Sequence, residues 1–285
     1  MIVSEAAITI SVELVLRHTR LDLAALLVDR SLLALLMLTL LLRPWNGQTR
    51  PRSAKLAAVR VITGGLTFLG WFGAIGALSG RVTQPVLWLD ALILAFFRSE
   101  KHSYERKTIP VLAAALVLFV ALALREPGTV TSLPKGILFL LIALGSRAAS
   151  YKVWERAQGA EEHLYWLIAP ALLGGAISGV AIGGWRPQAM SGPLFGALIL
   201  VALAGLSGYF YMNEVIARVG AFYTRVAEHW QLPLLWAAHL ATERAAADWR
   251  QGAISLLVCA AAAYTYWPRG RSTITPQRDG IAESS

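Results

Sequence analysis

The chain has 285 residues, of which 56% are hydrophobic and only 15% are charged, and its mean hydropathy is +0.55. Soluble domains carry about 25% charged residues, so this composition excludes an ordinary soluble domain and predicts an integral membrane protein. The net charge of +9 does not indicate nucleic-acid binding, because the cations fall in short loops between apolar segments, as the topology rule for membrane proteins expects.

Apolar segments recur along the whole chain, and a spanning helix needs about 20 mostly apolar residues. About ten segments qualify, although the first is short and polar, so about nine crossings is the alternative. The expected spans cover residues 2–16, 21–42, 56–78, 82–97, 109–124, 136–153, 164–184, 192–216, 221–240 and 252–267. We therefore predict an all-α integral membrane protein with about ten transmembrane helices.

The distribution of Lys and Arg indicates an orientation. With ten crossings and the N-terminus inside, the inner loops and the tail hold more cations than the outer loops, and the two richest loops lie inside. This excess predicts a multi-pass protein of the plasma (inner) membrane with both termini in the cytoplasm. No Lys or Arg precedes Arg17, so we expect no signal peptide. The polar stretch 268–285 predicts a disordered cytoplasmic tail.

Residues 219–244 are apolar enough to cross a bilayer, yet they carry Arg225, Glu228 and His229, followed by Pro233. Arg225 and Glu228 are three residues apart, so they share a helical face and can pair. Pro233 has no amide proton and should weaken the helix just beyond the charges. A charged, proline-interrupted membrane helix indicates a transport pathway. The alternative is a structural ion pair that seals a helix bundle.

Two passages, one starting at Gln84 and one at Gln231, look like copies of each other. Each has a proline near its start, an apolar run, a short polar stretch, another apolar helix, and a glutamate followed by a cation, which are Glu100-Lys101 and Glu243-Arg244. Five crossings in each half would invert the second half relative to the first, a design in which a site forms between the halves near the midplane. We expect one repeat over residues 1–130 and the other over 131–267.

These features resemble the drug/metabolite transporter (DMT) superfamily, and within it the EamA-type transporters. In that family each of two five-helix repeats ends with a proline-containing helix, a Gly-Glu-Arg-like turn and a helix that opens near a glycine. Glu243-Arg244 and Gly252 fit this pattern, and Arg30 is similar to an arginine often found in the second helix. The resemblance covers residues 8–267. It implies a ten-helix inverted repeat and transport of amino acids or related metabolites.

Ten polar or aromatic side chains within the expected spans are candidate substrate-binding residues. They are Glu13, Arg30, Trp71, Trp88, Asp90, Arg147, Tyr151, Arg225, Glu228 and His229. Charged groups inside a membrane segment face the bundle interior or a cavity, and they mark substrate pathways and proton relays. Trp71 and Trp88 either line a cavity or pack, and His229 either relays protons or forms a structural hydrogen bond.

Arg30 and Asp90 each support two interpretations. The planar fork of Arg30 suits a substrate carboxylate or phosphate, but Arg30 could equally form a structural pair with Glu13 or Asp90. Asp90 has no cation within one helical turn, so we expect it to be the acid that carries a coupling proton. The alternative for Asp90 is a hydrogen-bonded carboxylic acid in a helix interface. Glu13 has Arg17 one turn away, which can neutralise it.

The sequence contains no catalytic signature such as a P-loop, an HExxH helix or a GxSxG elbow, so we expect no enzyme activity, no cofactor and no metal. The leading hypothesis is a secondary transporter that exports a small polar or charged metabolite by alternating access, with a proton as the simplest energy source. The alternatives are a transporter or flippase of a phosphorylated or lipid-linked sugar, a membrane-embedded lipid-modifying enzyme with Glu228 and His229 as acid and base, and an accessory subunit. The expected partners are a small-molecule substrate and membrane lipids, without nucleic acid, and a homodimer remains open.

Overall fold

The computed structural model describes residues 2–19, 21–47, 50–96, 105–125, 130–159, 162–184, 191–243 and 249–266. Within these ranges the chain is a bundle of helices without strands, as the composition predicted. Five described helices are long and apolar enough to cross a membrane by length and composition. They are α2 (Leu23–Leu42), α3 (Ala54–Leu78), α7 (Leu133–Gly159), α8 (Leu164–Gly183) and α9 (Gly192–Ala227). The protein is therefore an all-α membrane protein.

Shorter helices complete the bundle around these five. They are α1 (Ile2–His18), α4 (Gly80–Leu87), α5 (Leu89–Phe96), α6 (Glu105–Ala123), α10 (Gln231–Glu243) and α11 (Trp249–Tyr266), with the 3₁₀ helices η1 (Pro44–Asn46) and η2 (Glu228–Trp230). Asp22 and Ser53 cap α2 and α3, since their side chains accept hydrogen bonds from the amides of Ala25 and Leu56. Such caps satisfy amides that have no partner within the helix.

Most of the expected spans correspond to one helix each, with ends that shift by a few residues. The span 82–97 is different, because a turn at Trp88 divides it into α4 and α5. Pro85 lies inside α4 and has no N–H group, so the hydrogen-bond ladder is already weakened just before the turn.

The spans 192–216 and 221–240 also differ from the expectation. α9 continues past their boundary with a kink at Gly220, whose φ of 79° and ψ of 167° are not helical. The helix then gives way to η2 before α10 begins at Gln231. Pro233 is the third residue of α10, where its missing N–H has no partner within the helix. The interruption therefore lies at Glu228–Trp230, just before Pro233, and the expectation that Pro233 weakens the helix stays a prediction.

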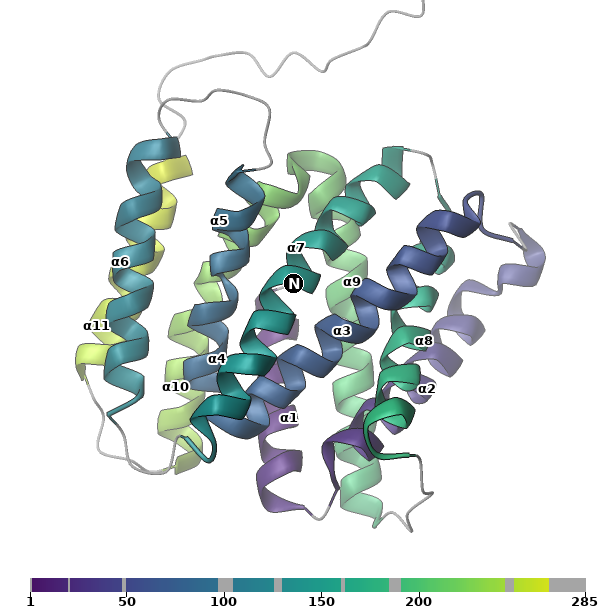
Figure 1. Cartoon of the computed structure of the whole chain (residues 1–285), viewed down its shortest axis with the longest axis horizontal. Helices are drawn as coiled ribbons and strands as arrows, with labels where there is room; N and C mark the ends of the chain where they lie inside the picture. The colour runs from purple at the N-terminus through teal and green to yellow at the C-terminus, as the bar shows by residue number, and fades with distance from the viewer. Residues whose placement is uncertain are drawn as a thin grey trace, which may run out of the picture.

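Small residues bring α3 and α8 into close contact. A Cβ on Gly65 would overlap the Gly174 carbonyl, and a Cβ on Gly174 would overlap the Val61 carbonyl, so neither position has room for a side chain. Between membrane helices such close approach of backbones gives the dispersion contacts that hold the pair together. Figure 1 shows α2 beside α8 at one end of the bundle and α6 beside α11 at the other.

The helix contacts follow a pairing scheme. α3 packs against α7 and α8, α1 and α2 both pack against α9, α4 packs against α6, and α10 packs against α11.

Several predictions from the sequence fall outside the described residues: the turn at Glu100-Lys101, Arg244 and the tail 268–285. The side chain of Glu243 is likewise not described.

Candidate functional site

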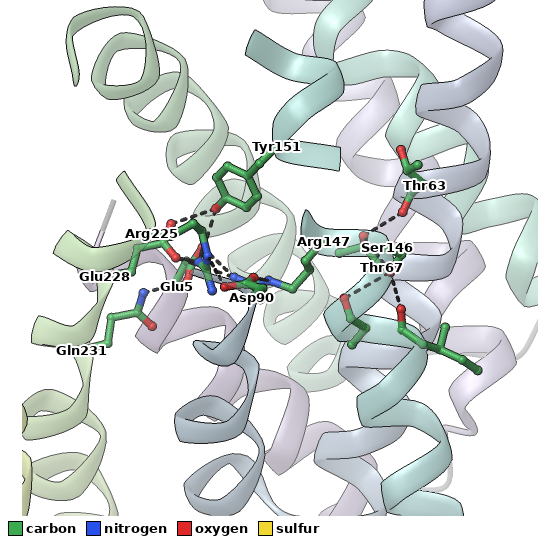
Figure 2. Close-up of polar contacts among 12 residues, drawn as sticks. Glu5, Thr63, Thr67, Asp90, Ser146, Arg147, Tyr151, Arg225, Glu228 and Gln231 are labelled. Carbon is green, nitrogen blue, oxygen red and sulfur yellow. Dashed lines mark hydrogen bonds and ion pairs between the residues drawn. The ribbon is translucent and has the colours of Figure 1, made fainter. Parts of the chain in front are cut away.

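A cluster of buried charges lies where the broken helices meet α1 and α7. Its carboxyl groups come from Glu5 of α1, Asp90 of α5 and Glu228 of η2, and its guanidinium groups come from Arg147 of α7 and Arg225 of α9. Figure 2 shows these side chains converging on one point from their different helices. The turn at Trp88 and the η2 segment place Asp90 and Glu228 there. The broken helices therefore position the charges.

Asp90 is bound by both arginines. Arg225 Nε donates to Asp90 Oδ1 at 2.9 Å, and Arg147 Nε lies 3.2 Å from Asp90 Oδ2. No cation lies within one helical turn of Asp90, as noted from the sequence, but the two arginines come from helices distant in the sequence, so the interpretation of Asp90 as an unpaired carboxylate was wrong. The predicted pair of Arg225 with Glu228 is present, and Tyr151 donates a hydrogen bond of 2.9 Å to Glu228.

Glu5 completes the cluster at the edge nearest α10. Its Oε1 lies 3.7 Å from Arg147 Nη2 and 4.0 Å from Arg225 Nη1, and its Oε2 accepts a hydrogen bond of 2.6 Å from Gln231. These ion-pair distances are longer than those at Asp90. Glu5 is also the cluster carboxyl that lines the cavity described below.

The cluster holds more acid than base, with three carboxyl groups against two guanidinium groups among the described residues. Burying ion pairs costs several kcal/mol of desolvation for each ion, and their attraction repays this only with close geometry and further hydrogen bonds. A fully ionised cluster would be one positive charge short of balance. The arrangement can therefore take up a proton or a cationic group.

A cavity of about 70 Å³ adjoins the cluster between α1, α2, α3, α7 and α9. Four of the predicted binding residues line it, namely Arg30, Trp71, Arg147 and Tyr151, and Glu5 lines it as well. Phe68 and Tyr209, which the sequence analysis did not single out, also form part of its wall. The cavity thus has a polar side next to the charge cluster and an aromatic side.

Arg30 lies in the cavity wall away from the cluster and is only 1% exposed. Its guanidinium carbon lies 4.3 Å from the centre of the Phe68 ring, a cation–π arrangement. It pairs with neither Glu13 nor Asp90, and within the described part of the chain no carboxylate forms an ion pair with it. The proposed structural pair of Arg30 with either acid is therefore wrong.

Three of the ten predicted residues belong neither to the cavity wall nor to the charge cluster. Glu13 accepts a hydrogen bond of 2.9 Å from the Gly80 amide at the start of α4 and pairs with Arg17 at 3.3 Å. Trp88 is fully buried and stacks on His229, with the ring centroids 4.6 Å apart. Glu228 faces the arginines while His229 packs against Trp88, so the two side chains do not converge as an acid–base pair.

Two helix starts in the bundle are built in the same way. Ser79, with φ of 78° and ψ of 160°, precedes Gly80, whose amide is bound by Glu13. Gly220, with φ of 79° and ψ of 167°, precedes Ala221, whose amide donates to Glu155 at 2.7 Å. In each case a glutamate, on α1 or on α7, accepts from the amide that follows a residue of positive φ.

Other contacts inside the bundle also occur twice, and the two occurrences are separated along the chain by nearly the same number of positions as the two caps. We call this separation the register of the repeat. Gln84 donates to Thr9, and Arg225 donates to Tyr151 at 3.3 Å. Gln231 donates to Glu5, and Arg147 lies beside Asp90. Arg225 follows Gln84 along the chain, and Tyr151 follows Thr9, by nearly the same number of positions. Gln231 follows Asp90, and Arg147 follows Glu5, by nearly that number as well. Trp88 and His229 are counterparts in this register and stack on each other.

Sequence reasoning missed Glu5, Gln231, Phe68 and Tyr209. A signal for Glu5 was present, because Glu5, Thr9 and Glu13 recur every four residues and so form one polar stripe on α1. All three are buried. The sequence offered no comparable signal for Phe68 or Tyr209, since an aromatic residue in an apolar helix is most often part of the core.

In comparisons with known proteins, no family model and no curated protein sequence matches this chain. The resemblance to EamA-type transporters therefore stays a prediction from the sequence.

Proposed function

We propose that the protein is a secondary transporter that moves a small polar or charged metabolite across the bilayer by alternating access. The observation that carries the proposal is the charge cluster at the interruptions of two broken helices, beside a cavity. Charges within a membrane are costly and are kept where they serve a substrate or ion pathway. In transporters, the sites for substrate and coupling ion form where helices are interrupted between two repeats.

The repeated contacts support a ten-helix arrangement of two inverted five-helix halves. The capping of Gly80 by Glu13 and of Ala221 by Glu155 would be one contact present twice. The packing of α3 on α7 corresponds to that of α9 on α1. In this register Gln84 corresponds to Arg225, whereas the two similar sequence passages had suggested that Gln84 corresponds to Gln231. The proposal keeps both termini in the cytoplasm, as the distribution of cations predicts.

A proton is the proposed coupling ion, and the geometry favours Glu5 over Asp90 as its carrier. Asp90 is fully buried between two arginines, so a proton there would disrupt two close ion pairs. Glu5 reaches the cavity and has the longer ion-pair distances. A proton on Glu5 would also balance the cluster, which has one carboxyl group too many for its two arginines.

The structure gives less support to the alternatives. At about 10–15 Å³ for each water, the cavity of about 70 Å³ has room for only a small molecule, which argues against a lipid-linked sugar. A lipid-modifying enzyme with Glu228 and His229 as acid and base would need the two groups to act on one substrate. Glu228 instead contacts Tyr151 and the arginines, while His229 stacks on Trp88.

Alternating access can be tested without knowledge of the substrate. The chain has one cysteine, Cys259, so Cys259→Ser gives a background free of thiols. In that background we expect Ser150→Cys, in the cavity wall, to react with a small membrane-impermeant thiol reagent from either side of oriented vesicles. Ala202→Cys, at a fully buried position on α9, is the control and should stay unlabelled. Labelling of Ser150→Cys from one side only would exclude the proposal.

A further inference from the structure

The second charged feature of the cavity is Arg30, which is separate from the charge cluster. Its Nε and Nη1 atoms have no hydrogen-bond partner, and its side chain is 1% exposed. A buried guanidinium without an anion is unfavourable, because burying an isolated charge costs far more than burying a paired one. The group therefore lies ready for an anion that the chain's described residues do not supply.

A comparison with Arg60 shows that burial beside an aromatic ring does not by itself leave an arginine of this bundle without partners. Arg60 is equally buried and also lies over an aromatic ring, with its guanidinium carbon 4.6 Å from the centre of the Trp154 ring. Arg60 donates to the Leu167 carbonyl at 2.9 Å from Nη2 and at 3.1 Å from Nε, and it also donates to Ser150. Arg60 is thus a structural arginine between helices, whereas Arg30 lines the cavity with donors free.

The surroundings of Arg30 restrict the shape of an anion. The cavity wall around it is formed by Phe68, Trp71 and Tyr209. Gly205 leaves space for the guanidinium, since a Cβ at this position would overlap Arg30 Nη2. The volume of about 70 Å³ corresponds to roughly five waters at 10–15 Å³ for each. The cavity is not enclosed, so the flat body of a small ligand can extend beyond this volume while its polar end lies at Arg30.

We propose that Arg30 is an oxyanion subsite of this cavity and that it binds the carboxylate of a small organic acid with a flat apolar body. The planar fork of an arginine matches the two oxygens of a carboxylate, and the aromatic side chains pack against the body of the ligand. The inference rests on the proposed transport function only in treating the cavity as the substrate site. Binding itself does not require transport.

The test is equilibrium binding to the purified full-length protein in detergent at neutral pH, with benzoate as the probe. Benzamide is the comparison ligand with the same ring and no charge, and benzylamine has the same ring and the opposite charge. Inorganic phosphate is the comparison ligand for a different oxyanion. We expect benzoate to bind and to raise the unfolding temperature. We expect benzamide and benzylamine to bind much more weakly. Binding of phosphate without benzoate, or no binding of any probe, would overturn the carboxylate assignment.

Variants separate the subsite from general effects on folding. Arg30→Gln should weaken benzoate binding by at least about 30-fold, as truncation of one partner of a buried charge pair does. Arg30→Lys keeps the charge but loses the fork, so it should restore binding only in part. Arg60→Gln is the matched control, because it removes an equally buried arginine outside the cavity. It should lower stability but keep the wild-type affinity for benzoate.

A glycine pair gives a test that leaves Arg30 in place. In Gly205→Ala the new methyl group should displace the end of the flexible Arg30 side chain, so benzoate should bind more weakly while the protein still folds. Gly196→Ala lies on the same helix with nothing within 4 Å of the added Cβ, and it should bind as the wild type does. Unchanged benzoate affinity in both Arg30→Gln and Gly205→Ala would refute the subsite. Transport could still operate in that case, so the two proposals fail separately.

Discussion

Trp88 and His229 stack with their ring centroids 4.6 Å apart and their planes tilted by 31°. The two residues stand at the two helix interruptions, Trp88 in the turn between α4 and α5 and His229 in η2. The stack therefore joins the segments that place Asp90 and Glu228 in the charge cluster. Trp88 has no exposed surface, so removal of its indole would leave a cavity that neighbouring side chains could fill only by rearranging.

Trp88→Ala should lower the free energy of unfolding by about 3–5 kcal/mol, because it removes a fully buried indole and leaves a cavity. The measurement is equilibrium unfolding in mixed micelles. Trp249→Ala, at a position that is 70% exposed, is the control and should change the stability by no more than about 0.5 kcal/mol. Similar values for the two variants would show that the stack does not hold the interruptions together.

The two helix caps should contribute similarly and independently. Glu13→Gln and Glu155→Gln each weaken a charge-assisted hydrogen bond to a helix amide, so each should cost about 1–3 kcal/mol of unfolding free energy. The double variant should show the sum of the two losses within about 0.5 kcal/mol. Glu214→Gln affects only an exposed pair with Arg218 and should cost less than about 1 kcal/mol.

Exchange of Arg225 and Glu228 should not restore the protein. The two residues pair with each other, but Arg225 also donates to Asp90 and Glu228 accepts from Tyr151. The double variant Arg225→Glu with Glu228→Arg would place a carboxylate beside Asp90, so we expect a loss of about 3–5 kcal/mol. Thermal unfolding of the two single variants and the double variant measures this. Recovery of wild-type stability in the double variant would show that the pair acts alone.

The sequence predicted the fold class and much of the charge cluster for a physical reason. Apolar length and composition decide whether a helix enters a membrane, so the helix spans could be placed from the sequence. The pair of Arg225 and Glu228 was predictable because it is local to one helix. The contacts of Asp90 with Arg147 and Arg225 were not, since all three residues come from different elements and only tertiary packing brings them together.

The interruptions at Trp88 and at Glu228–Trp230 were also beyond sequence reasoning. Both lie inside segments that the sequence predicts as single spans, and the prolines near them mark the regions but not the residues at which the helices break. The contact that Glu13 makes was beyond sequence reasoning for a similar reason. A carboxylate within a membrane segment indicates a site, but the backbone amide of Gly80 occupies this one.

The topology prediction is open to a direct experiment. In the Cys259→Ser background, Ser53→Cys and Ser272→Cys should both react with a membrane-impermeant thiol reagent only from the cytoplasmic side. Ser53 is the cap of α3 and lies in the loop between α2 and α3, and residue 272 lies outside the described residues. Labelling of Ser272→Cys from the opposite side would exclude an even number of crossings between these two positions and the ten-helix proposal with it.

The last prediction concerns the proton. The sequence favoured Asp90 as its carrier, whereas the contacts favour Glu5, so the two neutral variants should behave differently. Asp90→Asn leaves Arg147 and Arg225 without their closest carboxylate, and it should cost about 3–5 kcal/mol of stability. Glu5→Gln keeps the hydrogen-bonding shape, removes the excess acid and should remain folded.

Transport in proteoliposomes distinguishes the two carboxyl groups. With a ligand identified by binding, Glu5→Gln should abolish uptake driven by a pH gradient while exchange of labelled for unlabelled substrate at equal pH continues. Gln231→Glu is the variant that should restore function. Gln231 contacts Glu5, so an added carboxyl at that position supplies another group that can take up a proton. It should therefore restore part of the pH-driven uptake when combined with Glu5→Gln. A Glu5→Gln protein that still concentrates substrate in response to a pH gradient would rule out Glu5 as the carrier.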